Sequence, residues 1–255
     1  LPDKDFYFNT AERFGQIRAA YLKHIERMLG FAGIEDASKR AAEIMALETR
    51  IAEKHWDRAQ MRDRDRTYNL MSFAELEKKY SGYDWAAHFG VTGMKLPKEV
   101  NVSTPSAVAP VIDIINTTPL ATWRDYLSFH AVANHADILS EEIDAANFDF
   151  SGKMLSGQPA QRERWKRAVG LIGSQGGLGD ALGQIYVDRH FKPEAKQSMD
   201  ALVENLRRAL RQNIEKLDWM GEETKAEAYK KLSSFRPKIG YPGKWRDYSG
   251  VTIVA

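Results

Sequence analysis

The stretch from Pro193 to Leu217 reads PEAKQSMDALVENLRRALRQNIEKL and is the most regular part of the sequence. Its apolar residues recur at steps of three and four, the spacing that gathers side chains on one face of an α-helix. A proline suits the first turn of a helix, because its missing N–H would have no helical partner there. We therefore predict a long amphipathic helix with a core stripe formed by Met199, Leu202, Val203, Leu206, Leu210, Ile214 and Leu217.

The same period extends to the N-terminal part of the 255 residues. One helix is predicted over 11–31, with Tyr21 and Ile25 in its stripe, and a second follows a cap at Asp36 or Ser38. This second helix has one narrow buried edge and is charged on its other faces. The edge consists of Ala41, Ile44, Leu47 and Ile51, and the charged residues are Lys39, Arg40, Glu43, Glu48, Arg50, Glu53 and Lys54.

The middle of the chain is less regular. Residues 62–66 form a charged break, and Ser72-Phe73-Ala74-Glu75 is a capping box that starts a short helix through Tyr80. A further helical turn is expected at 84–89, a short extended piece at 99–103, and an apolar segment from Pro105 to about Asn116.

A long helix is predicted from Thr118, as its cap, and Pro119 to about Asn147. Its inward residues are expected to be Leu120, Trp123, Leu127, Ala131, Ile138 and Ile143. Gly152, Gly157 and Pro159 indicate a loop, and 161–172 and 221–235 are predicted helices. The fold class that follows is all-α: a multi-helix lobe with long amphipathic helices and little or no sheet.

Composition narrows the function classes. Lysine plus arginine number 37 and aspartate plus glutamate 35, so the net charge is +2, which argues against a nucleic-acid partner. Cysteine is absent, which excludes thiolate zinc sites and thiol nucleophiles. No apolar run approaches the length of about 20 residues that spans a membrane. The chain starts at Leu1 and stops in the apolar run Val251–Ala255, and we expect both ends to be cuts within a longer protein.

A search for catalytic motifs assigns no catalytic, cofactor-binding or metal-binding residue. None of the histidines lies in an H-E-x-x-H pattern, and His130 and His135 are about 140° apart around a helix, too far to chelate one ion. The six are His24, His55, His88, His130, His135 and His190. Gly173–Gly179 lacks the G-K-[ST] ending of a phosphate loop and is interpreted as a connection between helices. Adjacent glutamates at 141–142 and 222–223 diverge on a helix and form no carboxylate dyad.

The most specific string of residues lies near the C-terminus: Leu217-Asp218-Trp219-Met220-Gly221-Glu222-Glu223-Thr224-Lys225, Ala228, Lys231-Leu232 and Lys238-Ile239-Gly240-Tyr241-Pro242. It resembles a stretch of the neprilysin family of zinc peptidases, which includes the endothelin-converting enzymes and the bacterial PepO oligopeptidases. Leu1-Pro2-Asp3-Lys4-Asp5-Phe6-Tyr7, Arg164–Ala168, Gly183–Val187 and Phe191 agree in order and spacing. Ala168 replaces a cysteine of the animal enzymes, as expected of a bacterial member without disulfides.

The resemblance implies a two-lobed parent enzyme that cleaves oligopeptides, in which one lobe carries zinc. Residues 1–240 match its helical, non-catalytic lobe, and 241–255 would start the crossing toward the missing catalytic lobe. The zinc motifs and the N-A-[FY] substrate motif would lie beyond this segment, so the segment alone is predicted to be inactive. An extracytoplasmic location, periplasmic or secreted, is also implied. The alternative is a free-standing helical scaffold that binds a peptide or partner without catalysis.

Overall fold

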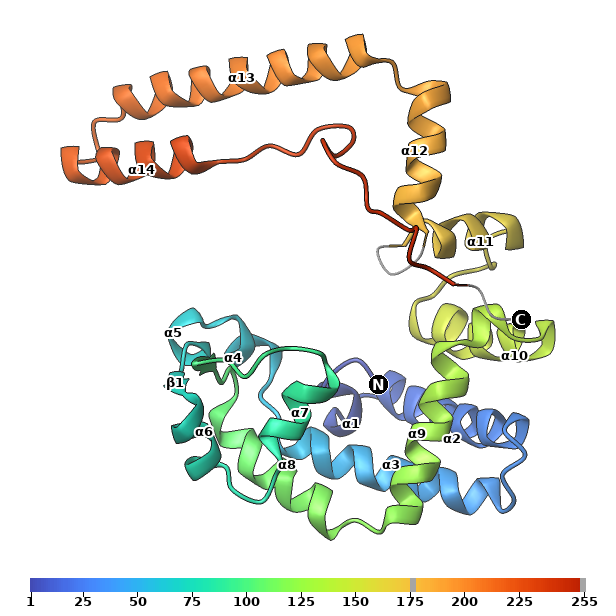
Figure 1. Ribbon diagram of the computed structural model, residues 1–255. Helices are drawn as coiled ribbons and strands as arrows, with labels where there is room; N and C mark the ends of the chain where they lie inside the picture. Colours follow the sequence, from blue (N-terminus) through green and yellow to red (C-terminus); the bar gives the residue numbers. More distant parts are fainter. Residues whose placement is uncertain (175–177, 253–255) are drawn as a thin grey trace. The chain divides into compact units, whose positions relative to one another are not determined.

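The structure is a computed structural model of residues 1–255, and it describes residues 1–174 and 178–252. The chain forms two compact units, Leu1–Gln161 and Arg162–Ala255, here called the first and the second unit. Almost all the regular structure is helical, which confirms the predicted all-α class (Figure 1). The predicted boundary between a helical lobe at 1–240 and a crossing segment at 241–255 stays a prediction.

The first unit is built around a pair of long helices that pack against each other, α2 and α3. They are joined by a short turn and are crossed by α9 (Figure 1). Its helices are α1 Asp5–Phe8, α2 Glu12–Phe31, α3 Ala37–Lys54, α4 Arg58–Arg62, α5 Arg64–Thr67, α6 Phe73–Lys79, α7 Trp85–Val91, α8 Pro105–Thr117, α9 Leu120–Asn134 and α10 Glu141–Phe148, with a 3-10 turn Ala136–Ile138 and a π-helix Asp149–Leu155.

The main core of the first unit lies between α2, α3, α9 and the π-helix. The predicted stripes of α2 and α3 supply most of it, and Ile25, Met28, Leu29 and Ile44 have no exposed surface. Phe129 is also buried and enters from α9. The periodicity over 11–31 and 37–54 thus identified the faces that the fold buries.

A smaller core lies under the one sheet of the described residues. Strands β1 Leu70–Ser72 and β2 Glu99–Asn101 pair antiparallel, with Met71 opposite Val100. The capping box is confirmed: Glu75 N donates to Ser72 Oγ at 3.3 Å, and Ser72 N donates back to Glu75 Oε2 at 2.8 Å. The extended piece at 99–103 and the helical turn at 84–89 are confirmed by β2 and α7.

Two predictions of helix ends are wrong, and that for Asp36 is correct in position only. Residues 62–66 are not a break, because Asp57 and Asp63 cap the short helices α4 and α5. Asp36 stands at the N-cap of α3 but adopts a left-handed conformation, with a φ of 54°, and its side chain makes no capping hydrogen bond. Thr118 does not cap α9, because its hydroxyl donates to Ile114 O at 2.6 Å, at the end of the preceding helix.

The predicted helix from 118 to 147 is in fact broken after Asn134. The imidazole of His135 lies 2.8 Å from Ala131 O at the end of α9, and a 3-10 turn then redirects the chain so that α10 packs on α2. Tertiary packing overrides the local helical preference here. Leu120, Leu127 and Ile138 were expected inward, but more than half of each is exposed.

Gly152 was assigned to a loop and instead lies in the π-helix. The ring of Phe148 occupies the place where a Cβ at position 152 would stand. A glycine therefore allows the close approach of that ring, whereas Gly157 and Pro159 do lie in the connection that follows.

The second unit consists of α11 Arg164–Ile172, α12 Gly179–His190, α13 Pro193–Lys216 and α14 Glu222–Ser234. The bounds of α13 and α14 match the predicted helices, and the two pack as a hairpin (Figure 1). Of the α13 stripe only Ile214 is buried in this chain, while Met199, Leu202, Leu206 and Leu210 are exposed. Its assignment as core is therefore wrong for the described residues. Positions 175–177 of the glycine-rich connection lie outside those residues.

Candidate functional site

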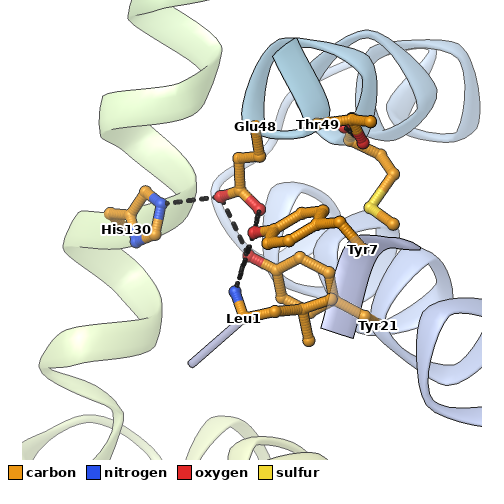
Figure 2. A network of polar contacts seen from close by, with 7 residues as sticks. Leu1, Tyr7, Tyr21, Glu48, Thr49 and His130 are labelled. Atoms are coloured by element: carbon orange, nitrogen blue, oxygen red, sulfur yellow. Dashed lines mark hydrogen bonds and ion pairs between the residues drawn. The ribbon is translucent and has the colours of Figure 1, made fainter. Parts of the chain in front are cut away.

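The most concentrated polar cluster of the first unit surrounds the carboxylate of Glu48 (Figure 2). Tyr7 of α1 donates its hydroxyl to Glu48 Oε2 at 2.8 Å, and Tyr21 of α2 donates to Oε1 at 3.0 Å. His130 Nε2 of α9 lies 3.1 Å from Oε1. The amino group of Leu1 donates to the Tyr7 hydroxyl at 3.0 Å. Four helices are thus joined at one buried carboxylate.

The electrostatics of the cluster keep Glu48 ionised. Burial alone would raise its pKa, but the hydrogen bond with His130, the amino group of Leu1 and the two tyrosine hydroxyls together lower the pKa below its usual value. Burial, followed by the charge of Glu48, raises the pKa of both Tyr7 and Tyr21. A carboxylate whose oxygens already accept these hydrogen bonds is a structural anchor rather than a free general base.

Sequence reasoning missed Glu48, because it placed this residue among the charges of a solvated face. The signal was present: Glu48 follows Ile44 by four positions and precedes Ile51 by three, so it shares their face of α3. Only 7% of Glu48 is exposed. A second missed contact joins Arg40 to the buried Asp125, at 2.7 Å from Nη1 to Oδ2.

A cavity of about 370 Å³ lies beside the Glu48 cluster. The side chains of Glu48, Tyr7 and His130 form part of its wall, and His55, Trp56, Tyr126 and the N-terminal residues are among the others that line it. A second, largely apolar pocket of about 240 Å³ lies between α7 and α8 and is lined by Tyr83, Trp85, His88, Val108, Val111 and Ile115, among others.

His24 is the most buried of the histidines, with 7% of its surface exposed. Its ring stacks on Phe150, with the centroids 4.8 Å apart, and meets the edge of Phe129 at 5.8 Å. Burial, and then the nearby charge of Arg27, lowers the pKa of His24 to about 4. It is therefore a neutral core side chain at pH 7.

Four of the other histidines contact different groups. His130 contacts Glu48 and His135 contacts Ala131 O, so the structure does not bring them together. Tyr83 lies 3.1 Å from His88, and the ring of His190 lies 5.1 Å from that of Tyr186.

The described side chains do not fit a zinc ion. A zinc site needs three or four converging protein ligands. Glu48 and His130 bond to each other without a third ligand beside them, and no group of three or more histidine, cysteine, aspartate or glutamate residues in the described part of the chain is placed to hold a metal. We assign no catalytic step to these residues, and the location of the zinc ligands outside residues 1–255 stays a prediction.

The two remaining motifs are surface features. Glu141-Glu142 and Glu222-Glu223 are exposed in the first turns of α10 and α14, where negative charge favours the helix.

None of the helices in the described ranges combines the length and apolar character that crossing a bilayer requires.

Comparisons with known proteins identify the family. At 26% identity, mouse membrane metallo-endopeptidase-like 1 aligns with 95% of this chain, which covers 33% of that protein. The Mycobacterium tuberculosis zinc metalloprotease Zmp1, solved in complex with an inhibitor, is 37% identical with a TM-score of 0.82, over 97% of this chain and 37% of the other. PepO from Lactobacillus rhamnosis shares the fold at 22% identity and a TM-score of 0.78, over 96% of this chain and 39% of its own.

The chain therefore spans about one third of the length of the curated relatives that it matches. The model of peptidase family M13 matches residues 1–242, which is nearly the whole chain. The resemblance seen in the sequence is thus confirmed, and this chain belongs to peptidase family M13.

Proposed function

We propose that residues 1–255 are a helical, non-catalytic part of a zinc-dependent endopeptidase that cleaves oligopeptides. The observation that carries this proposal is the M13 match along residues 1–242. Relatives named as a metallo-endopeptidase and a zinc metalloprotease support the reaction class. Because the chain corresponds to about one third of these relatives, the zinc ligands and the substrate-binding motif belong to the remaining polypeptide in this proposal.

The role that we assign to this segment is steric. Rigid helices that wall an enclosed cavity admit thin, flexible peptides and exclude folded proteins. Two features of the first unit support this role: its buried core, and the Glu48 carboxylate that ties α1, α2, α3 and α9 together. Exclusion of water from such a cavity would also strengthen electrostatic interactions at the metal.

The first test compares the complete reading frame with residues 1–255 alone. We expect one zinc per chain and chelator-sensitive peptide hydrolysis from the complete protein, and neither from the 255-residue segment. Stoichiometric zinc in the purified segment would contradict the proposal. A reading frame without H-E-x-x-H and N-A-[FY] motifs would favour the alternative, a free-standing scaffold that binds peptides or partners without catalysis.

The second test addresses the steric role. The complete enzyme is offered one cleavable sequence in two forms, as a free oligopeptide and as a surface loop of a folded protein. We expect rapid cleavage of the free peptide only. Equal rates, with the folded protein shown to remain native, would exclude the steric role while leaving the zinc peptidase assignment intact.

The location of the parent enzyme outside the cytoplasm, in a periplasm or secreted, is also part of this proposal, and the family resemblance supports it. A bacterial origin is supported by the 37% identity to the mycobacterial enzyme. Fractionation of cells that express the complete reading frame tests the location directly.

A further inference from the structure

The second unit carries more exposed apolar surface than a self-sufficient unit does. Among its described residues Ile214 alone is buried, whereas α11, α12 and α13 each expose large apolar side chains. The exposed fraction is 60% for Leu206 and 50% for Leu210. Where exposed apolar side chains gather in one patch, they mark a site of interaction with another surface.

The surface is shaped into a groove along α13. The groove has a volume of about 420 Å³, and its apolar lining comes from α13, from the end of α14 and from the segment that follows α14. These residues are Val203, Leu206, Leu210, Leu232, Phe235, Pro237 and Ile239.

Polar contacts fix the two walls of the groove and leave its apolar floor uncovered. Arg207 donates to Leu232 O at 3.0 Å, and Lys196 donates to Ile239 O at 2.7 Å. The guanidinium of Arg211 lies over the ring of Tyr229, 4.6 Å from its centroid. The groove therefore exists before any partner arrives, which lowers the entropic cost of docking.

The charged residues that line the groove indicate the sign of the charge on the partner. Arg207 and Lys238 are the charged lining residues, and no acidic residue lines the groove. Arg207 is already paired with Glu204 at 2.8 Å. Within the part of the chain that the structure describes, the exposed ammonium group of Lys238 has no ion pair or hydrogen bond. A carboxylate on the partner would complement it.

We propose that the α13 groove docks a segment of the same peptidase that lies outside residues 1–255, with an aliphatic face over Leu206 and Leu210 and an acidic side chain at Lys238. The inference rests on the proposed function. It commits to the rest of the peptidase because the chain accounts for only 33% of mouse membrane metallo-endopeptidase-like 1 and 37% of Zmp1. A partner of that length within one polypeptide is present at a high effective concentration.

The test uses the absence of cysteine from residues 1–255. Leu206→Cys is made both in the 255-residue chain and in the zinc-loaded complete enzyme, after any cysteines elsewhere have been replaced, and its reaction with a maleimide is timed. Gln197→Cys is the matched control, since this exposed residue lies on the opposite face of α13. Leu210→Cys is a second probe, and circular dichroism checks the fold of each variant.

We expect Leu206→Cys to react at least about ten-fold more slowly in the complete enzyme than in the 255-residue chain, and Gln197→Cys to react equally in both. Lys238→Glu should restore part of the lost reactivity. Equal labelling of Leu206→Cys in both proteins would overturn the docking proposal. So would protection already present in the 255-residue chain, whether light scattering finds a dimer or a monomer.

Zinc content and peptidase activity are measured on the same samples. If the complete enzyme is active while Leu206→Cys reacts freely with the maleimide, the docking proposal is excluded and the proposed function stands. If the complete protein has neither zinc nor peptidase activity, the proposed function itself is contradicted.

Discussion

Helices α2 and α13 share an amphipathic sequence pattern, but the apolar face is buried in α2 and largely exposed in α13. Both are long and carry an apolar stripe at helical spacing. The stripe of α2 lies in the core, where Ile25, Met28 and Leu29 have no exposed surface, whereas Leu206 and Leu210 of α13 are at least half exposed. Periodicity therefore identifies the apolar face of a helix but does not show whether the same chain covers it.

The difference has a consequence for stability. Folding must bury enough apolar surface to offset the loss of conformational entropy. The first unit does so with its own residues, whereas Ile214 alone is buried among the described residues of the second unit. Under the docking proposal, the second unit therefore depends on the remaining peptidase. The stability of the second unit should therefore be linked to the remaining peptidase.

The largest expected effect is a difference in stability between the two units when a leucine of the apolar stripe is replaced by alanine. Leu29→Ala removes a fully buried side chain and leaves a cavity, so it should lower the free energy of unfolding of the first unit by about 2–5 kcal/mol. Leu206→Ala in the 255-residue chain should change stability by less than about 0.5 kcal/mol. Urea unfolding monitored by amide hydrogen exchange in α2 and α13 measures both. Equal losses would mean that the α13 stripe is covered in this chain.

The next effect concerns pH and the first unit alone. His24 has a pKa of about 4 in the folded chain against 6.5 when free, so the unfolded state binds more protons between these values. Stability should fall as the pH drops from 6.5 to about 4, by at most about 3 kcal/mol. The charged residues that line the same pocket as His24 are Lys23, Arg27 and Asp149.

His24→Phe should remove most of that pH dependence, because phenylalanine fits among the same rings and does not titrate. His135→Gln, at an exposed site, serves as the control: it retains His24, so the loss of stability at low pH should persist. An unaltered slope in His24→Phe would show that other groups cause the acid sensitivity of the first unit.

A smaller loss is expected at the Glu48 cluster. Glu48→Ala leaves the hydroxyls of Tyr7 and Tyr21 without their acceptor and should cost about 2 kcal/mol of unfolding free energy in the first unit. Glu215→Ala removes an exposed carboxylate of α13 and should cost less than about 0.5 kcal/mol. Chemical unfolding at pH 7 compares the two, and a neutral Glu48→Ala would show that the cluster does not anchor the four helices.

The smallest effect tests the segment after Tyr241 as a hinge toward the catalytic part. Gly243→Ala meets no atom within 4 Å of the added Cβ and should not alter stability measurably in the 255-residue chain. In the complete enzyme, a stiffer segment should change the kcat for a peptide by about two- to five-fold. Peptide kinetics identical to those of the unmodified enzyme would argue against a hinge at Gly243.

The sequence predicted local features well where the signal was confined to one turn or one face. The capping box at Ser72 and Glu75, the start of α13 at Pro193 and the buried stripe of α2 were all confirmed. Predictions failed where another helix decided the outcome. Thr118 bonds back to α8 rather than capping α9, and the break at His135 follows from the packing of α10 on α2.

The candidate site was the less predictable part. The sequence contained no metal-binding pattern, and the structure adds none among the described residues. Glu48 was missed because its partners are distant along the chain: Tyr7 and Tyr21 precede it by 41 and 27 residues, and His130 follows it by 82. Single-residue charge and periodicity carry no information about such partners.

By itself, the sequence determined that this protein is helical, where most of its helices lie and, through its motifs, which peptidase family it belongs to, because these depend on spacing and on residues close together in the chain. Tertiary structure alone decided that Glu48 is a buried anchor and that the faces of α2 and α13 have different fates. The physical reason is that burial is a property of what packs against a side chain, and that neighbour is set by the fold and not by the local pattern.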